Sequence, residues 1–216
     1  MARDYTLDTT AAKEANTGGK RITEPGEYIG TFKQAWYEVN QNGTELVNFT
    51  FVCENGQEAG PLALYTHNNK GEELPSFKTF HAILACAKQR GVKAVQGQVT
   101  LWDYDKNAEV VKAKDTYPAL VGPRIGLVLT TEDYDGRNGV KARIVIAAPF
   151  NADTRQMAKE VLNNEPATAL DSYIAWLDKG NRWHKPLKNG GGQQASRATE
   201  HYSQDPFDDN DPFSHI

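Results

Sequence analysis

The 216-residue sequence has no long apolar run and a modest apolar content. No window approaches the roughly 18 consecutive apolar residues that a membrane-spanning helix needs. The first residues also lack the apolar segment of a secretory signal peptide. Hydrophobic residues make up 39% of the chain and the mean hydropathy is -0.63, which is low for a wholly packed globule. We therefore expect a cytoplasmic protein without a membrane segment, part of whose length is solvated.

Cysteine and recognisable catalytic motifs are equally scarce. Cys53 lies in a strand-like run and Cys86 in a helix-like run, so the two lack the paired spacing of a zinc site and are expected to be buried free thiols. No phosphate loop, nucleophile elbow or metal-binding His pair is present. We therefore predict no cofactor, no metal and no enzymatic activity. The acids Asp133 and Asp135 leave a metal-dependent nuclease as the least favoured alternative.

The chain also lacks the net positive charge that a nucleic-acid-binding protein usually carries. Lys and Arg number 24 against 28 Asp and Glu, a net charge of -4. The deficit is local, because residues 200–216 hold five acids and no Lys or Arg. Residues 1–199 therefore hold 24 basic and 23 acidic residues, a net charge of +1. Residues 179–199 hold five cations and no acid, so an acidic tail follows a basic neck.

Strand patterns dominate the part of the chain before this neck. A long β-rich run over 28–39 returns as 46–52 after the turn signal Asn42-Gly43, which predicts a hairpin. A third short strand is predicted over 62–65. A helix is then predicted over 77–90, where apolar residues recur at helical spacing and Gly91 marks the end.

Further strands follow this helix and are predicted over 99–102, 110–111, 125–129 and 140–146. Three strands, a helix and more antiparallel strands predict a mainly β fold, an OB-type Greek-key β-barrel with a helix after the third strand. A β-sandwich is the main competitor. Two short C-terminal helices, over 154–162 and 167–177, are expected to pack on the barrel.

These features divide the chain into four parts. Residues 1–21 are polar and aperiodic, which predicts a flexible N-terminal arm. Residues 22–178 form the predicted OB-fold domain with its appended helices. Residues 179–199 are a basic, glycine-rich linker, and residues 200–216 are expected to form a disordered acidic tail.

The tail carries two Asp-Pro-Phe units among its acids. A tail made only for solubility needs no aromatic anchors, whereas a peptide that docks on a basic, hydrophobic pocket needs both phenylalanine and carboxylates. The tail resembles the Asp-Asp-Asp-Ile-Pro-Phe terminus of bacterial single-stranded DNA-binding proteins, and this resemblance implies a partner-docking segment. The predicted partner-binding residues are Asp205, Phe207, Asp208, Asp209, Asp211 and Phe213.

The body, from Pro25-Gly26-Glu27-Tyr28 through the first hairpin and the third strand to the helix over 77–91, is similar to phage-encoded single-stranded DNA-binding proteins. The resemblance implies sequence-independent binding and protection of single-stranded DNA during phage-type replication, recombination or repair, in the host cytoplasm. Replication and recombination proteins are the partners expected of the tail. Homo-oligomerisation on DNA is left open.

Such a protein needs cations that follow phosphates and aromatic faces on which bases stack. Lys141 and Arg143 alternate with Ala142 and Ile144, so both cations are expected on the face opposite the apolar residues. The basic neck adds Trp183 among cations, either on the DNA path or as a surface for the acidic tail. The predicted DNA-binding residues are Lys33, Trp36, Tyr37, Tyr65, Trp102, Tyr104, Lys112, Lys114, Lys141, Arg143, Arg182, Trp183 and Lys185.

Core packing is the competing explanation for each of these aromatic residues, because strands are generically rich in them. Phe49 and Phe51 are assigned to the core, and Trp102 is expected to be partly exposed. Two other functions stay open: an RNA-binding OB protein and a protein-interaction adaptor. The first stays open because no residue pattern in the sequence distinguishes RNA from DNA by recognition of a 2′-hydroxyl.

Overall fold

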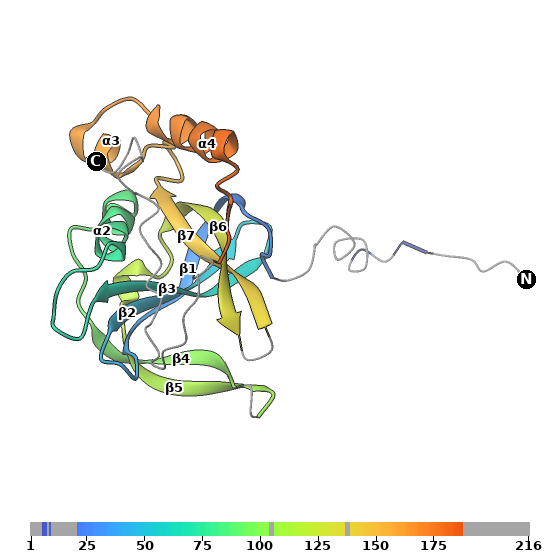
Figure 1. Ribbon diagram of the computed structural model, residues 1–216, viewed down its shortest axis with the longest axis vertical. Helices are drawn as coiled ribbons and strands as arrows, with labels where there is room; N and C mark the ends of the chain where they lie inside the picture. The colour runs from blue at the N-terminus through green and yellow to red at the C-terminus, as the bar shows by residue number, and fades with distance from the viewer. Residues whose placement is uncertain (1–5, 8, 10–20, 104–105, 137–138, 188–216) are drawn as a thin grey trace, which may run out of the picture.

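The computed structural model describes residues 6–7, 9, 21–103, 106–136 and 139–187 (Figure 1). Its elements, in chain order, are β1 (Gly26–Val39), β2 (Glu45–Cys53), β3 (Glu58–His67), α2 (Ser76–Cys86), β4 (Val95–Asp103), β5 (Ala108–Thr116), the 3-10 turn η1 (Pro118–Leu120), β6 (Arg124–Gly136), β7 (Gly139–Phe150), α3 (Ala158–Asn163), α4 (Ala169–Gly180) and β8 (His184–Lys185). No helix in these ranges is long and apolar enough to cross a membrane. The linker and tail from residue 188 onward, and nearly all of the predicted N-terminal arm, lie outside the described residues.

The strands form one sheet, which confirms the prediction of a mainly β fold. Five strands lie in the order β3-β2-β1-β5-β4, and β6 adds to β1 while also pairing with β7 and β8. All pairs are antiparallel except β6 with β8. Among the described strands, β3 and β7 share no ladder, so the sheet is not closed into a barrel. Figure 1 shows α3 and α4 together at one end of the molecule and the β4–β5 hairpin at the opposite end.

The first hairpin forms at the predicted turn. Gly43 adopts a φ of +80°, a left-handed conformation in which glycine has no steric cost. The side chain of Asn40 accepts hydrogen bonds from the backbone N–H groups of Asn42 and Thr44, at 3.0 and 2.9 Å. The Asn42-Gly43 sequence therefore correctly predicts the position of this turn.

The main core lies on the inner face of the sheet, beneath α2. Phe32, Phe49 and Phe51 are fully buried there, and the ring centroids of Phe32 and Phe49 lie 4.5 Å apart. The assignment of Phe49 and Phe51 to the core is confirmed. Helix α2 ends at Cys86, four residues before the predicted end, and Lys88 takes a left-handed φ of +55° just beyond it.

A second apolar cluster joins the C-terminal helices to β6 and β7. Leu170, Tyr173 and Leu177 of α4 are buried against Val128 and Phe150. The expectation that these helices pack on the sheet, instead of forming a separate domain, is confirmed. Both helices begin later than predicted: α4 by two residues and α3 by four.

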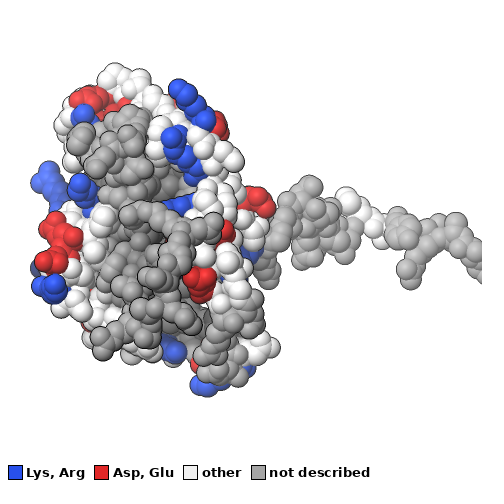
Figure 2. All heavy atoms as spheres, in the orientation of Figure 1, with Lys and Arg blue, Asp and Glu red and all other residues white. Residues whose placement is uncertain are grey.

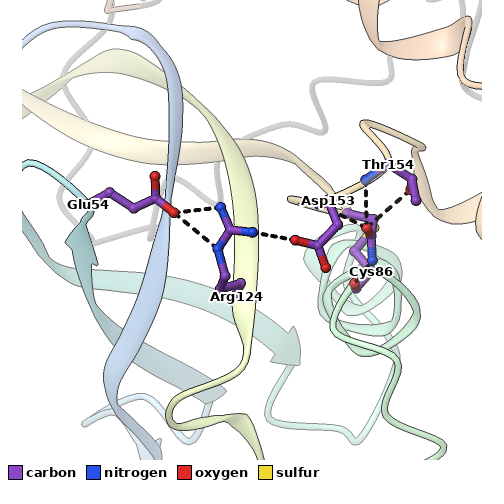
Figure 3. A network of polar contacts seen from close by, with 6 residues as sticks. Glu54, Cys86, Arg124, Asp153 and Thr154 are labelled. Atoms are coloured by element: carbon purple, nitrogen blue, oxygen red, sulfur yellow. Dashed lines mark hydrogen bonds and ion pairs between the residues drawn. The ribbon is translucent and has the colours of Figure 1, made fainter.

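The late start of α3 has a visible cause in the turn that follows β7. The Oδ1 atom of buried Asn151 accepts hydrogen bonds from the backbone N–H groups of Asp153 and Thr154, at 3.1 and 3.0 Å. Its Nδ2 donates to the carbonyl of Cys86 at 2.9 Å and so links this turn to α2. Figure 3 shows Arg124 of β6 reaching from Glu54 on one side to Asp153 on the other. These bonds hold residues 151–154 in a turn conformation that is incompatible with an α-helix, so α3 begins after it.

Candidate nucleic-acid interface

A groove with a volume of about 610 Å³ opens between β3, β7, the end of α4 and β8. This volume lies within the range of about 300–1,000 Å³ that is typical of ligand pockets. The groove occupies the place where β3 and β7 remain unpaired, so the open side of the sheet creates it. Three aromatic and three permanently basic side chains line it: Tyr65, Tyr173, Trp176, Arg143, Arg182 and Lys185. Four of these six residues are among the predicted DNA-binding residues.

Arg143 of β7 reaches the groove beside a carboxylate. Its Nε and Nη2 atoms lie 2.7 and 2.5 Å from Oε1 of Glu132, a side chain that is 8% exposed. Burial acts to lower the pKa of Arg143, but the charge and hydrogen bond of Glu132, together with a hydrogen bond to Tyr65, raise it above its ordinary value. Arg143 therefore stays charged at any working pH. Glu132 is the single carboxylate among the described residues that line the groove.

The outer face of β1, β2 and β3 continues from this groove. Cross-strand register places Glu38, Leu46 and Tyr65 in one row, and Trp36 in the next. Trp36, Asn48 and Lys114 all donate to the carboxylate of Glu38, at 3.3, 3.1 and 3.0 Å. The sequence indicated Trp36 and Lys114, and the structure brings them to the same face through Glu38.

Burial overturns one expectation on this face. Trp36 is 1% exposed, so it offers no open ring face on which a base could stack. The sequence places Trp36 on a strand, but it does not say what covers the side chain. The indole N–H keeps a hydrogen-bond partner in Glu38, as a buried tryptophan requires.

The beginning of the predicted linker is part of the fold. β8 pairs with β6 in parallel, with His184 beside Thr131 and Lys185 beside Glu132. The backbone N–H of Thr131 donates to the carbonyl of Trp183 at 2.9 Å. The Trp183 indole packs against the α4 cluster and donates to Asp178 at 2.7 Å. Trp183 therefore anchors the neck, and its neighbours Arg182 and Lys185 reach the groove.

Basic and acidic side chains are interspersed around this end of the molecule. Figure 2 shows Lys and Arg side chains around α4, with some acidic side chains among them. The Arg182 guanidinium lies over the ring of Trp176, with Cζ 4.4 Å from its centroid. Trp176 is a groove residue that sequence reasoning missed. Its neighbours Tyr173 and Leu177 are on the buried face of α4, and Trp176 lies at the rim of that face.

The β4–β5 hairpin holds two further predicted residues away from the described groove lining. Trp102 is 51% exposed, so the expectation of partial exposure is confirmed, and Lys112 is exposed on the neighbouring strand. The hairpin is attached to β1 through Gln34, whose side-chain amide bonds both the N–H and the carbonyl of Thr100, at 2.7 and 3.2 Å. Tyr104 lies outside the described residues.

The remaining predicted residues do not line the groove. Lys33 pairs with Glu58 at 3.2 Å. Tyr37 points to the face opposite Trp36, where burial, and then the charge and hydrogen bond of Glu45, raise its pKa. Lys141 is exposed near the tip of the β6–β7 hairpin. The six predicted partner-binding residues of the tail lie outside the described residues.

Of the two acids considered for a nuclease, Asp133 has a contact of another kind: its Oδ2 atom lies 3.3 Å from Nε2 of His184. Across the described ranges, no group of three or more His, Cys, Asp or Glu side chains is placed to hold a metal ion.

The groove combines basic and aromatic side chains. Positive charge beside aromatic rings suits a ligand that is both anionic and aromatic, and a nucleic acid strand has both properties. No protein-family model and no curated protein matches the chain.

Proposed function

We propose that this chain binds single-stranded nucleic acid, with DNA as the expected ligand, in the groove between β3, β7, α4 and β8. One observation carries the proposal. Three basic side chains, those of Arg143, Arg182 and Lys185, and the partly exposed rings of Tyr65 and Trp176 line one groove of about 610 Å³, with a single carboxylate among its described lining. Cations that neutralise phosphates and planar groups that stack on bases are the features by which proteins hold single strands without reading their sequence.

The strand order supports an OB-type fold as part of this proposal. Without the β4–β5 hairpin, the order is β3-β2-β1-β6-β7, and α2 follows β3. An OB fold is a five-stranded, partly open Greek-key barrel, and our sequence expectation placed its helix after the third strand. In this interpretation β4 and β5 are an insertion, and the groove lies at the opening between the first and last strands of the order.

A titration with three ligands tests the function. Oligo-dT should quench tryptophan fluorescence, and affinity should fall steeply as salt rises, because binding releases counterions from phosphates. Duplex of equal length should bind far more weakly, since its bases are not available for stacking. Oligo-rU binding much tighter than oligo-dT would instead support an RNA-binding protein. Absence of binding to all three ligands at low salt would refute the proposal.

The acidic tail is proposed to recruit replication or recombination proteins. Its support is the sequence of residues 200–216, where acids flank two phenylalanines. Deleting these residues should leave oligo-dT affinity unchanged or higher and abolish binding of the partner. A loss of DNA affinity would contradict this division of roles.

Exposed apolar side chains on the β4–β5 hairpin favour a second candidate, a protein-interaction adaptor. Trp102 and Val111 are 51% and 62% exposed on neighbouring strands, and exposed apolar groups of this kind often mark interaction sites. An adaptor would bind none of the oligonucleotides above. A Trp102→Ala variant with unchanged oligo-dT binding would place the hairpin outside the DNA path and leave it available for a protein.

A further inference from the structure

Three planar groups follow one another from the core to the surface at the end of α4. The rings of Tyr173 and Trp176 are stacked, with centroids 5.6 Å apart and planes inclined by 23°. The guanidinium of Arg182 lies over the Trp176 ring, with Cζ 4.4 Å from the centroid. Tyr173 is fully buried, Trp176 is half-buried and Arg182 is exposed. The series therefore ends at solvent with a guanidinium plane.

The turn that ends α4 fixes this guanidinium in place. Asn181 adopts a left-handed φ of +49°, and the N–H of Arg182 donates to the carbonyl of Leu177 at 2.8 Å. The side chain then folds back, and Nη1 donates to the carbonyl of Trp176 at 2.9 Å. A Cβ atom at Gly180 would overlap Nη1 and Cζ of Arg182. The absence of a side chain at position 180 is therefore what leaves room for the stack.

An arginine held in this way can serve two parts of a nucleotide at once. Its planar group stacks on aromatic faces, and its five N–H donors bind phosphate oxygens. One donor is used on the Trp176 carbonyl. Trp36, by contrast, is buried, and Trp183 is packed against α4 with its N–H bound to Asp178.

We propose that Arg182 is the base-stacking platform of the groove, and that a nucleobase extends the series Tyr173–Trp176–Arg182 by one member. The inference rests on the proposed function, because it names the contact through which the groove holds a base. It goes beyond the sequence expectation, in which the candidate stacking faces were the aromatic residues Trp36, Tyr37, Tyr65, Trp102, Tyr104 and Trp183.

Two variants separate stacking from charge. Gly180→Ala keeps every charge and forces the guanidinium off Trp176, and alanine is the better helix former, so folding should be retained. Arg182→Lys keeps the positive charge but loses the plane. Each variant should bind oligo-dT about 5- to 150-fold more weakly, as expected for the loss of one stacked base, with an unchanged salt slope. Gly91→Ala is the control, because a Cβ there would meet no atom within 4 Å, and it should bind like the unmodified protein.

A modified ligand provides the decisive measurement. An oligo-dT with a single abasic unit, placed in turn at each position, should show one position where the unmodified protein loses affinity. At that position, Gly180→Ala and Arg182→Lys should cause no further loss. Losses that add independently, or variants that bind like the unmodified protein, would overturn the platform while oligo-dT binding stands. Failure of the unmodified protein to bind oligo-dT would overturn both the platform and the proposed function.

Discussion

Replacing Glu132 with glutamine tests how the groove uses its charge. The carboxylate is 8% exposed and holds Arg143 through contacts of 2.5 and 2.7 Å. Glutamine keeps the size of the side chain and an oxygen acceptor but removes the negative charge. If the groove binds phosphates, Arg143 then neutralises one more of them, and affinity for oligo-dT rises.

The size of the effect follows from counterion release. Each phosphate contact of a single strand adds about -0.7 to the slope of log affinity against log salt. One extra contact therefore multiplies the affinity loss between 50 and 200 mM salt by about 2.6. The assay is fluorescence anisotropy of labelled oligo-dT over that salt range, and the slope is the quantity compared.

A matched control removes the same charge elsewhere. Glu54 pairs with Arg124 outside the groove (Figure 3), so Glu54→Gln should leave the slope as it was. Thermal unfolding of both variants measures how much stability the protein loses when Arg143 remains half-buried without its carboxylate partner. A folded Glu132→Gln protein with an unchanged slope would refute the idea that Arg143 faces phosphates.

Three further predictions concern the scaffold. Glu160 accepts from three backbone N–H groups, which hold its pKa below the ordinary value although burial acts to raise it. Glu160→Gln should therefore lower the free energy of urea unfolding at pH 7 by about 1–3 kcal/mol. The difference in unfolding free energy between the variant and the unmodified protein should shrink as pH falls below 4.5, because the carboxylate then becomes protonated. Burial raises the pKa of Cys86 to about 12, so a disulfide reagent at pH 8 should modify Cys86 only after denaturation. Cys53 is half-buried and should react first. Rapid labelling of both thiols in the native protein would refute this prediction. Gln34→Ala should raise the hydrogen-exchange rate of the Thr100 amide about five-fold, for a loss of about 1 kcal/mol, and an unchanged rate would mean that the hairpin is held by other contacts.

Local signals predicted much of the sheet and four of the six aromatic and basic groove residues, but they did not predict the groove itself. The Asn42-Gly43 turn and the alternation around Phe49 act over a few residues, so the sequence is enough to predict them. The groove depends on the distance between β3 and β7, which are far apart in the chain, and on the return of residues 184–185 to β6. No periodicity encodes such contacts.

Trp36 and Trp183 show the same limit on the scale of single side chains. The sequence around Trp36 predicts a strand, but it does not predict that other residues bury the side chain. The composition around Trp183 shows neighbouring cations, but it does not predict the hydrogen bond to Asp178. Trp176 could have been noticed as the third residue after Tyr173 on a predicted helix, since such pairs are neighbours on a helix surface. Its contact with Arg182 required the left-handed turn at Asn181.

Charge and stacking can be tested separately in this groove, because one variant removes a charge without moving a planar group and the other moves a planar group without removing a charge. Glu132→Gln changes the number of phosphates neutralised and should move the salt slope, whereas Gly180→Ala changes only the position of a plane and should move affinity at every salt concentration equally. If both variants moved the slope, Arg182 would be acting mainly as a charge. If neither did while affinity fell in both, Arg143 would be a structural partner of Glu132 and Tyr65, and the groove would hold its ligand through the planar groups at the end of α4.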